Sequence, residues 1–141
     1  MKRVVPGVLN RLEIMLSKSS RPSILSDSLV GGNEIMKASV YTRHGDESEI
    51  RISDHVLRPV PTADELLVKV QAAGVNPVDV KLRENSLPDW FIPLPKIIGS
   101  DLCGIVEEVG DNVYEGFQVG DRVFAMMPHI WSGWGSTAQY A

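Results

Sequence analysis

Short apolar and β-branched runs, separated by glycine, proline and aspartate, recur from Met36 onwards and constrain the fold most. Many short strands at close spacing with few helices predict a mostly-β barrel or sandwich. From Met36 onwards only one segment, residues 78–83, has a pattern suited to a helix, and that helix would be short. The expected strands are residues 38–41, 50–53, 66–72, 105–109 and 122–125, with a last strand near residue 138.

The clearest of these strands, residues 66–72, leads into a junction with a helix. It alternates, with β-branched side chains on one face and polar ones on the other. Gly74 breaks the pattern, and Asn76-Pro77 forms a turn whose proline suits the first helical position. Asp79 then falls in the first turn, where unpaired backbone N–H groups favour a carboxylate. We interpret the junction as a candidate site, with a purely structural turn as the alternative.

Composition sets the broad class of protein. A chain of 141 residues with 43% hydrophobic and 23% charged residues can bury a core as one domain. Its net charge of -4 argues against a general nucleic-acid binder. The single cysteine, Cys103, excludes an internal disulfide, and its apolar surroundings predict a small buried side chain. No apolar run approaches the roughly 18 residues of a membrane helix.

Residues 1–35 differ from the rest of the chain. Their first part is basic and rich in serine, and several apolar residues can share one helical face. Such a leader resembles a mitochondrial transit segment, so a mitochondrial location is the alternative to a cytoplasmic one. A flexible extension, or a misassigned start with the true start at Met36, would explain the same pattern.

Four motifs in order give the chain a family resemblance. They are Ala72-Ala73-Gly74-Val75-Asn76-Pro77-Val78-Asp79, then Ile98-Gly99-Ser100-Asp101-Leu102-Cys103-Gly104-Ile105-Val106-Glu107-Glu108-Val109-Gly110, then Val119-Gly120-Asp121-Arg122-Val123, then Gly135-Ser136-Thr137-Ala138-Gln139-Tyr140. Residues 36–141 therefore resemble the N-terminal GroES-like domain of the medium-chain dehydrogenase/reductase superfamily, in its zinc-independent quinone oxidoreductase and enoyl reductase branch. The resemblance implies a partly open β-barrel with short helices.

A complete family member pairs this domain with a Rossmann domain that binds NADPH. The present sequence lacks the glycine-rich turn that such a domain uses for the pyrophosphate. Gly133-Trp134-Gly135 does not have the required spacing and precedes no expected helix. We therefore expect a product truncated before the cofactor domain, monomeric as a fragment, whose activity by itself is open.

The resemblance also indicates the site residues. In zinc-dependent relatives, cysteine and histidine ligands stand at the positions of Asn76 and Ser100, so no catalytic zinc is expected here. One cysteine and three histidines agree, because they cannot supply a typical tetrahedral set. Asn76 is instead the candidate catalytic residue, because its amide can donate to and accept from a nicotinamide or a substrate carbonyl. The expected cleft residues are Asn76, Pro77, Asp79, Ser100, Asp101, Trp131 and Trp134.

The implied reaction is hydride transfer from NADPH to a small molecule, either a quinone or an α,β-unsaturated carbonyl compound. The particular substrate is left open. The alternative is an inactive fragment or a non-enzymatic GroES-like binding module.

Overall fold

A computed structural model of the protein describes residues 34–85, 93–113, 116–127 and 133–141. Nearly all of the expected N-terminal extension lies outside these ranges, and so does Trp131. Their predicted roles therefore stay predictions.

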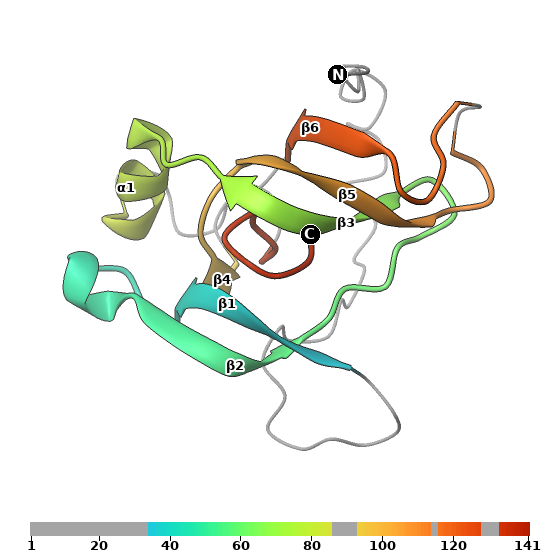
Figure 1. Cartoon of the computed structure of the whole chain (residues 1–141). Coiled ribbons are helices and arrows are strands. Elements are labelled where there is room, and N and C mark those ends of the chain that lie inside the picture. Colours follow the sequence, from blue (N-terminus) through green and yellow to red (C-terminus); the bar gives the residue numbers. More distant parts are fainter. Residues whose placement is uncertain (1–33, 86–92, 114–115, 128–132) are drawn as a thin grey trace.

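The first of two small sheets contains the beginning of the described chain (Figure 1). Its central strand β1 (Ile35–Tyr41) lies between β2 (Arg51–Leu57) and the short β4 (Lys96–Ile97). Both pairings are antiparallel. We call this the β1 sheet.

The second sheet contains the strand that leads to the candidate site. Its central strand β5 (Asp101–Val109) lies between β3 (Leu66–Ala73) and β6 (Arg122–Met126), and both pairings are antiparallel. We call this the β5 sheet. Because β4 and β5 follow one another in the chain, residues 98–100 cross directly from one sheet to the other.

Each sheet buries its own group of apolar side chains. In β1, Met36, Ala38 and Val40 are buried at alternate positions, which is why this segment forms a half-buried strand. They pack with Val56 and Ile97 in one cluster. The cluster of the β5 sheet consists of Val68, Leu102, Val106 and Val123.

The alternation predicted for β3 holds over part of the strand. Lys69 and Gln71 are exposed, as expected, while Val68 is buried. However, Leu67 is buried as well, although alternation places it on the same side as Lys69 and Gln71. The register shift beside it inserts its extra residue, Glu107, in β5 and not in β3.

Two predictions about β5 have different outcomes. Gly104 interrupts an apolar strand pattern, which predicts either a bulge or a close backbone approach. The close approach is confirmed, because a Cβ there would overlap the Lys69 carbonyl oxygen of β3. Cys103 was expected to be buried, and this is wrong, because the thiol is exposed. Leu102 and Gly104 face the core, so the pleat turns the residue between them outwards.

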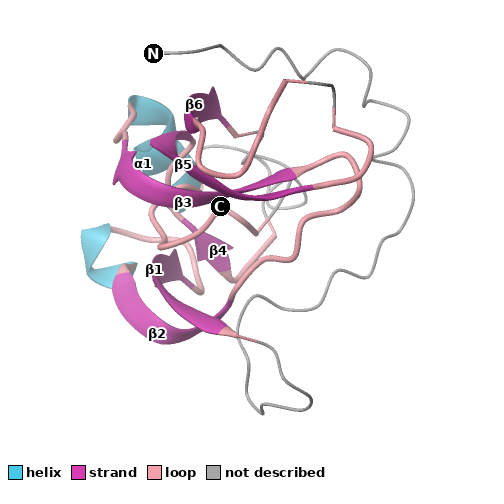
Figure 2. Ribbon diagram, turned by 45° about the vertical axis from the view of Figure 1, so that its right-hand side comes forward, coloured by secondary structure: helices cyan, strands magenta, loops and turns pink. Residues whose placement is uncertain are grey.

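Residues 133–141 lie between the two sheets and bond to both (Figure 2). The Ser39 N–H of β1 donates to the Thr137 carbonyl at 2.8 Å, and the Val70 N–H of β3 donates to the Gln139 carbonyl at 2.9 Å. The predicted last strand is therefore only partly right, because Ala138 and Tyr140 make isolated bridges, one to each sheet.

The fold is mostly β, as predicted. Two stacked sheets and the segment between them make a partly open arrangement, and the described strands do not close into a barrel. Helical structure in the described ranges consists of α1 (Pro77–Arg83) and the 3-10 turn η2 (Glu47–Glu49). None of the described helices has the length and apolarity needed to cross a membrane.

Candidate functional site

Helix α1 begins at the predicted junction. Asn76 is its N-cap and Pro77 occupies its first turn. The Asp79 carboxylate accepts a hydrogen bond from the Asn76 backbone N–H at 2.7 Å, and the Asp79 N–H donates to the Asn76 carbonyl at 3.0 Å. The predicted capping role of Asp79 is confirmed. This pair fixes the backbone of Asn76 at the end of β3.

The side chain of Asn76 points to the crossing between the two sheets. Its Nδ2 donates to Asp101 Oδ2 at 2.8 Å and lies 3.4 Å from Ser100 Oγ. Because an ionised carboxylate only accepts, the amide nitrogen must face Asp101 and Oδ1 must face the other way. One amide hydrogen is firmly held, and the other makes only a long contact.

Glycines at both ends allow the junction and the crossing to approach closely. The Gly74 N–H donates to the Asp101 carbonyl at 2.8 Å, and a Cβ on Gly74 would lie 3.1 Å from the Asp101 Cβ. Gly99 has a φ of +94°, a left-handed conformation that favours glycine. These two positions place Ser100 and Asp101 against Asn76, although they lie 24 and 25 residues away.

The site has an exposed side and a buried side. Val75 is 84% exposed and Pro77 is also exposed, so apolar groups flank Asn76 towards the solvent. Asn76 itself is half-buried, while Ser100 and Asp79 are buried. A ligand approaching from the solvent side would meet apolar surface around a single amide.

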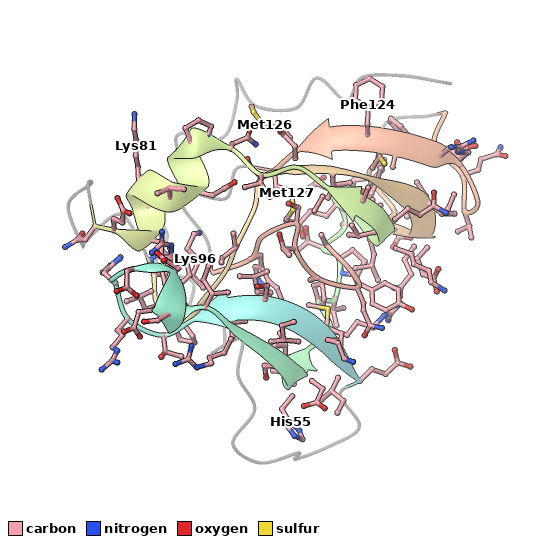
Figure 3. The ribbon with its side chains drawn as sticks, turned by 60° about the vertical axis from the view of Figure 1, so that its left-hand side comes forward. His55, Lys81, Lys96, Phe124, Met126 and Met127 are labelled. Carbon is pink, nitrogen blue, oxygen red and sulfur yellow. The ribbon has the colours of Figure 1, made fainter. Side chains whose placement is uncertain are left out.

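A cluster of buried polar and charged side chains lies on the far side of α1. It combines Asp79 and Arg83 of the helix with Tyr41 of β1 and Lys96 of β4, and each of these residues is at most 6% exposed. Figure 3 shows Lys96 between the helix and the β1 sheet, whereas Lys81 extends away from the helix. The Arg83 guanidinium donates to the Gly45 carbonyl at 2.6 Å.

Burial and neighbouring charge shift two pKa values in this cluster. Burial lowers the pKa of Lys96 to about 8, and the negative charge of Asp79 opposes part of that shift. Burial is the largest cause of the rise in the pKa of Tyr41 to about 12. The negative charge of Asp79 adds to this rise, and the positive charge of Arg83 opposes part of it. The carboxylate of Asp79 therefore acts on both groups.

The structure brings together part of the predicted set. Asn76, Ser100 and Asp101 share hydrogen bonds, Pro77 lies beside them and Asp79 lies behind them. Trp134 is elsewhere, because it packs against the apolar cluster of the β1 sheet. A role for Trp134 in the cleft stays a prediction.

Sequence reasoning missed Lys96. It follows Pro93 and Pro95, and lysine is almost never fully buried, so its residue type predicted an exposed side chain. The signal that could have found it is its position directly before the apolar Ile97-Ile98 pair. Residues in the described parts of the chain offer no group of three or more histidine, cysteine, aspartate or glutamate side chains that could hold a metal ion.

The class of protein is defined by two small β sheets and by a polar strand-to-helix junction that faces residues 98–100, where the chain crosses between the sheets. It is the N-terminal domain of medium-chain dehydrogenases and reductases, as the motifs predicted. The chain belongs to the alcohol dehydrogenase GroES-like domain family, whose model matches residues 62–141. Its relatives place it in the zinc-independent quinone oxidoreductase and alkenal reductase branch.

Three relatives illustrate the similarity. A mouse quinone oxidoreductase is 39% identical over 93 residues, which cover 66% of this chain and 28% of the relative. An NADPH-dependent alkenal/one oxidoreductase of Arabidopsis thaliana, described as chloroplastic, is 37% identical over 90 residues, covering 64% of this chain and 23% of the relative. A mycobacterial protein solved in complex with NADPH has a TM-score of 0.61 and 36% identity, covering 74% of this chain and 29% of that one.

The chain thus spans about a quarter of the length of these curated relatives.

Proposed function

We propose that residues 36–141 are the catalytic-domain portion of an NADPH-dependent oxidoreductase that reduces a quinone or an α,β-unsaturated carbonyl compound without zinc. The observation that carries this proposal is the half-buried Asn76 amide, held by Asp101 at 2.8 Å and flanked by exposed apolar residues. The names of the relatives support the substrate class.

Asn76 is the group that acts on the substrate carbonyl. When NADPH is bound it supplies the hydride, and negative charge develops on the carbonyl oxygen of the substrate. The amide hydrogen of Asn76 that only makes the long contact to Ser100 turns to this oxygen and stabilises the charge. Asp101 retains the other amide hydrogen and so keeps the donor in place.

The residues present fit a nicotinamide but not a zinc ion. Asn76 Oδ1 faces away from Asp101, so it can accept a hydrogen bond from an amide such as the nicotinamide carboxamide. Asn76, Ser100 and Asp101 offer no thiolate or imidazole, the ligands that zinc prefers. We infer that the pyrophosphate is bound mainly by residues outside 36–141, because this sequence lacks the glycine-rich turn.

The test compares Asn76→Ala with Asn112→Ala, which changes an exposed asparagine in a turn. Oxidation of NADPH is followed at its absorbance maximum with a quinone and with an α,β-unsaturated aldehyde. Asn76→Ala should lower kcat/KM by about 100- to 1,000-fold, the loss typical of a single donor to a developing oxyanion. Asn112→Ala should leave it unchanged. Equal rates for Asn76→Ala and the unchanged protein would refute the assignment.

A second candidate is a non-enzymatic GroES-like module that binds a small molecule or is inactive by itself. The Asn76 amide fits it, because an amide can bind a small polar group without any redox step. If the folded protein neither oxidises NADPH nor changes its tryptophan fluorescence on NADPH addition, this second function is the better one. We also propose that the isolated chain is a monomer, which light scattering would test. We propose that it is located in the cytoplasm, with mitochondria as the alternative.

A further inference from the structure

The buried cluster behind α1 is connected to the candidate site through Asp79. Asp79, Arg83 and Lys96 are all nearly inaccessible to water, so their charges interact strongly and are costly to leave unbalanced. Two of the three are positive and come from different elements, the helix and β4. The negative partner, Asp79, belongs to the first turn of the helix.

Strand pairing brings Lys96 to this position. Lys96 of β4 lies directly opposite Tyr41 of β1 in the antiparallel register. Side chains of directly paired residues lie on the same face of a sheet, so Tyr41 shares the face from which Lys96 extends. Figure 3 shows Lys96 between α1 and the β1 sheet, and Asp79 is a buried residue of α1, so both charged side chains belong to one buried cluster. The shifted pKa values of Lys96 and Tyr41 agree with a nearby Asp79 charge.

The same carboxylate holds Asn76. Asp79 Oδ2 accepts from the Asn76 backbone N–H at 2.7 Å, and Asp79 Oδ1 is buried. A change in the charge opposite Asp79 would therefore alter the bond that sets the backbone of Asn76. The side chain of Asn76 would then move relative to Asp101, which is held in β5.

We propose that Lys96 is a positioning residue of the site: its buried ammonium holds Asp79, and through Asp79 it keeps the Asn76 amide on Asp101. The proposal rests on the proposed function only in taking Asn76 as the central residue. It adds a form of regulation, because loss of one proton from Lys96 would loosen the Asn76 amide.

Other titratable groups face the same cluster and must be separated from Lys96. Tyr41 loses its proton only near pH 12. The His44 ring lies 6.1 Å from the Tyr41 ring, and its Nδ1 donates to the Leu82 carbonyl at 3.1 Å. Arg83 also pairs with Glu84, whose Oε1 lies 3.5 Å from Arg83 Nη2. Because the His44 ring lies beside Tyr41, His44 is changed in a control variant.

The experiment follows the side-chain amide signals of the five asparagines by NMR in the full chain labelled with ¹⁵N-asparagine. The Asn76 signals are assigned by their loss in Asn76→Ser. Because burial lowers the pKa of Lys96 to about 8, they should shift between pH 6 and 10 with a midpoint near 8. In Lys96→Met this step should disappear, and in Lys96→Arg the signals should stay near their low-pH positions.

Two variants serve as controls. Lys81→Met removes an exposed lysine of the same helix and should leave the step intact. His44→Gln should also leave it intact. Asn76 signals that do not move with pH in the unchanged protein would refute the proposal, and so would a step that persists in Lys96→Met or disappears in His44→Gln. If Lys96→Met fails to fold, the unchanged protein, Lys96→Arg and His44→Gln still decide.

No cofactor is present in this measurement, so failure of NADPH turnover would not affect its outcome.

Discussion

Stability should depend on pH in a way set by the buried Lys96. Its pKa is about 8 in the folded protein and 10.5 in the unfolded chain, because burial disfavours the ammonium. Between these values the unfolded chain binds more protons than the folded one, so the free energy of unfolding rises with pH. A difference of 2.5 pKa units (10.5 minus 8) corresponds to about 3 kcal/mol. That gain is absent below pH 8 and complete above pH 10.5.

Tyr41 works in the opposite direction at higher pH. Its pKa is 10.0 in the unfolded chain and about 12 in the folded protein. Between these values the unfolded chain has lost the phenolic proton that the folded protein still holds, so the free energy of unfolding falls with rising pH. Lys96 and Tyr41 together therefore make their largest contribution to the free energy of unfolding near pH 10.

The assay is urea unfolding followed by tryptophan fluorescence at pH 7, 8, 9 and 10. The unchanged protein should gain about 2 kcal/mol between pH 8 and pH 10, as should Lys81→Met, which changes an exposed lysine. Lys96→Met should lack this gain, whatever its stability at pH 7. The reasoning is refuted if Lys96→Met shows the same rise as the unchanged protein.

Three further predictions test other parts of the fold. Gly104→Ala should lower the free energy of unfolding by about 3 kcal/mol, because the added methyl overlaps the backbone of β3. Gly120→Ala lies in open space and should lower it by only about 1–2 kcal/mol, because its φ is positive. Equal losses for the two variants in urea titrations would contradict this. Arg58→Ala should cost about 1–2 kcal/mol, because Arg58 donates to Glu108 at 2.7 Å and lies 4.7 Å from the centre of the Tyr140 ring. Arg58→Lys should recover only part of this loss. Cys103 should react with Ellman's reagent without denaturant, since it is exposed; a thiol that reacts only in urea would count against this.

Much of the fold follows from local patterns. Short apolar and β-branched runs predicted parts of β1, β3 and β5. Asn76-Pro77 with Asp79 predicted where α1 begins, because its capping chemistry is local in sequence. Element ends were less accurate: β2 runs to Leu57, beyond the predicted end at residue 53, because pairing with β1 continues as far as Ile35. Tertiary pairing of this kind is not encoded in either segment alone.

The site was predictable only where family motifs marked it. Asn76, Ser100 and Asp101 were named from their motifs, and their proximity depends on the approach of Gly74 to Asp101. Lys96 could not be found in this way. Its burial results from pairing with Tyr41 and from the position of α1, and a lysine beside prolines is ordinarily a solvated side chain.

The segment 133–141 has a consequence for the order of folding. Asn76 and Asp101 belong to the β5 sheet, whereas Lys96 and Tyr41 belong to the β1 sheet, and this segment bonds to both sheets. It joins the beginning of the described chain to its end, through Ala38 with Ala138, so its contacts are among the slowest to form. During synthesis, the Asn76 amide can meet Asp101 early. The Asn76 amide can be positioned by Lys96 only after residues 133–141 have been synthesised, because this segment bonds the two sheets to each other.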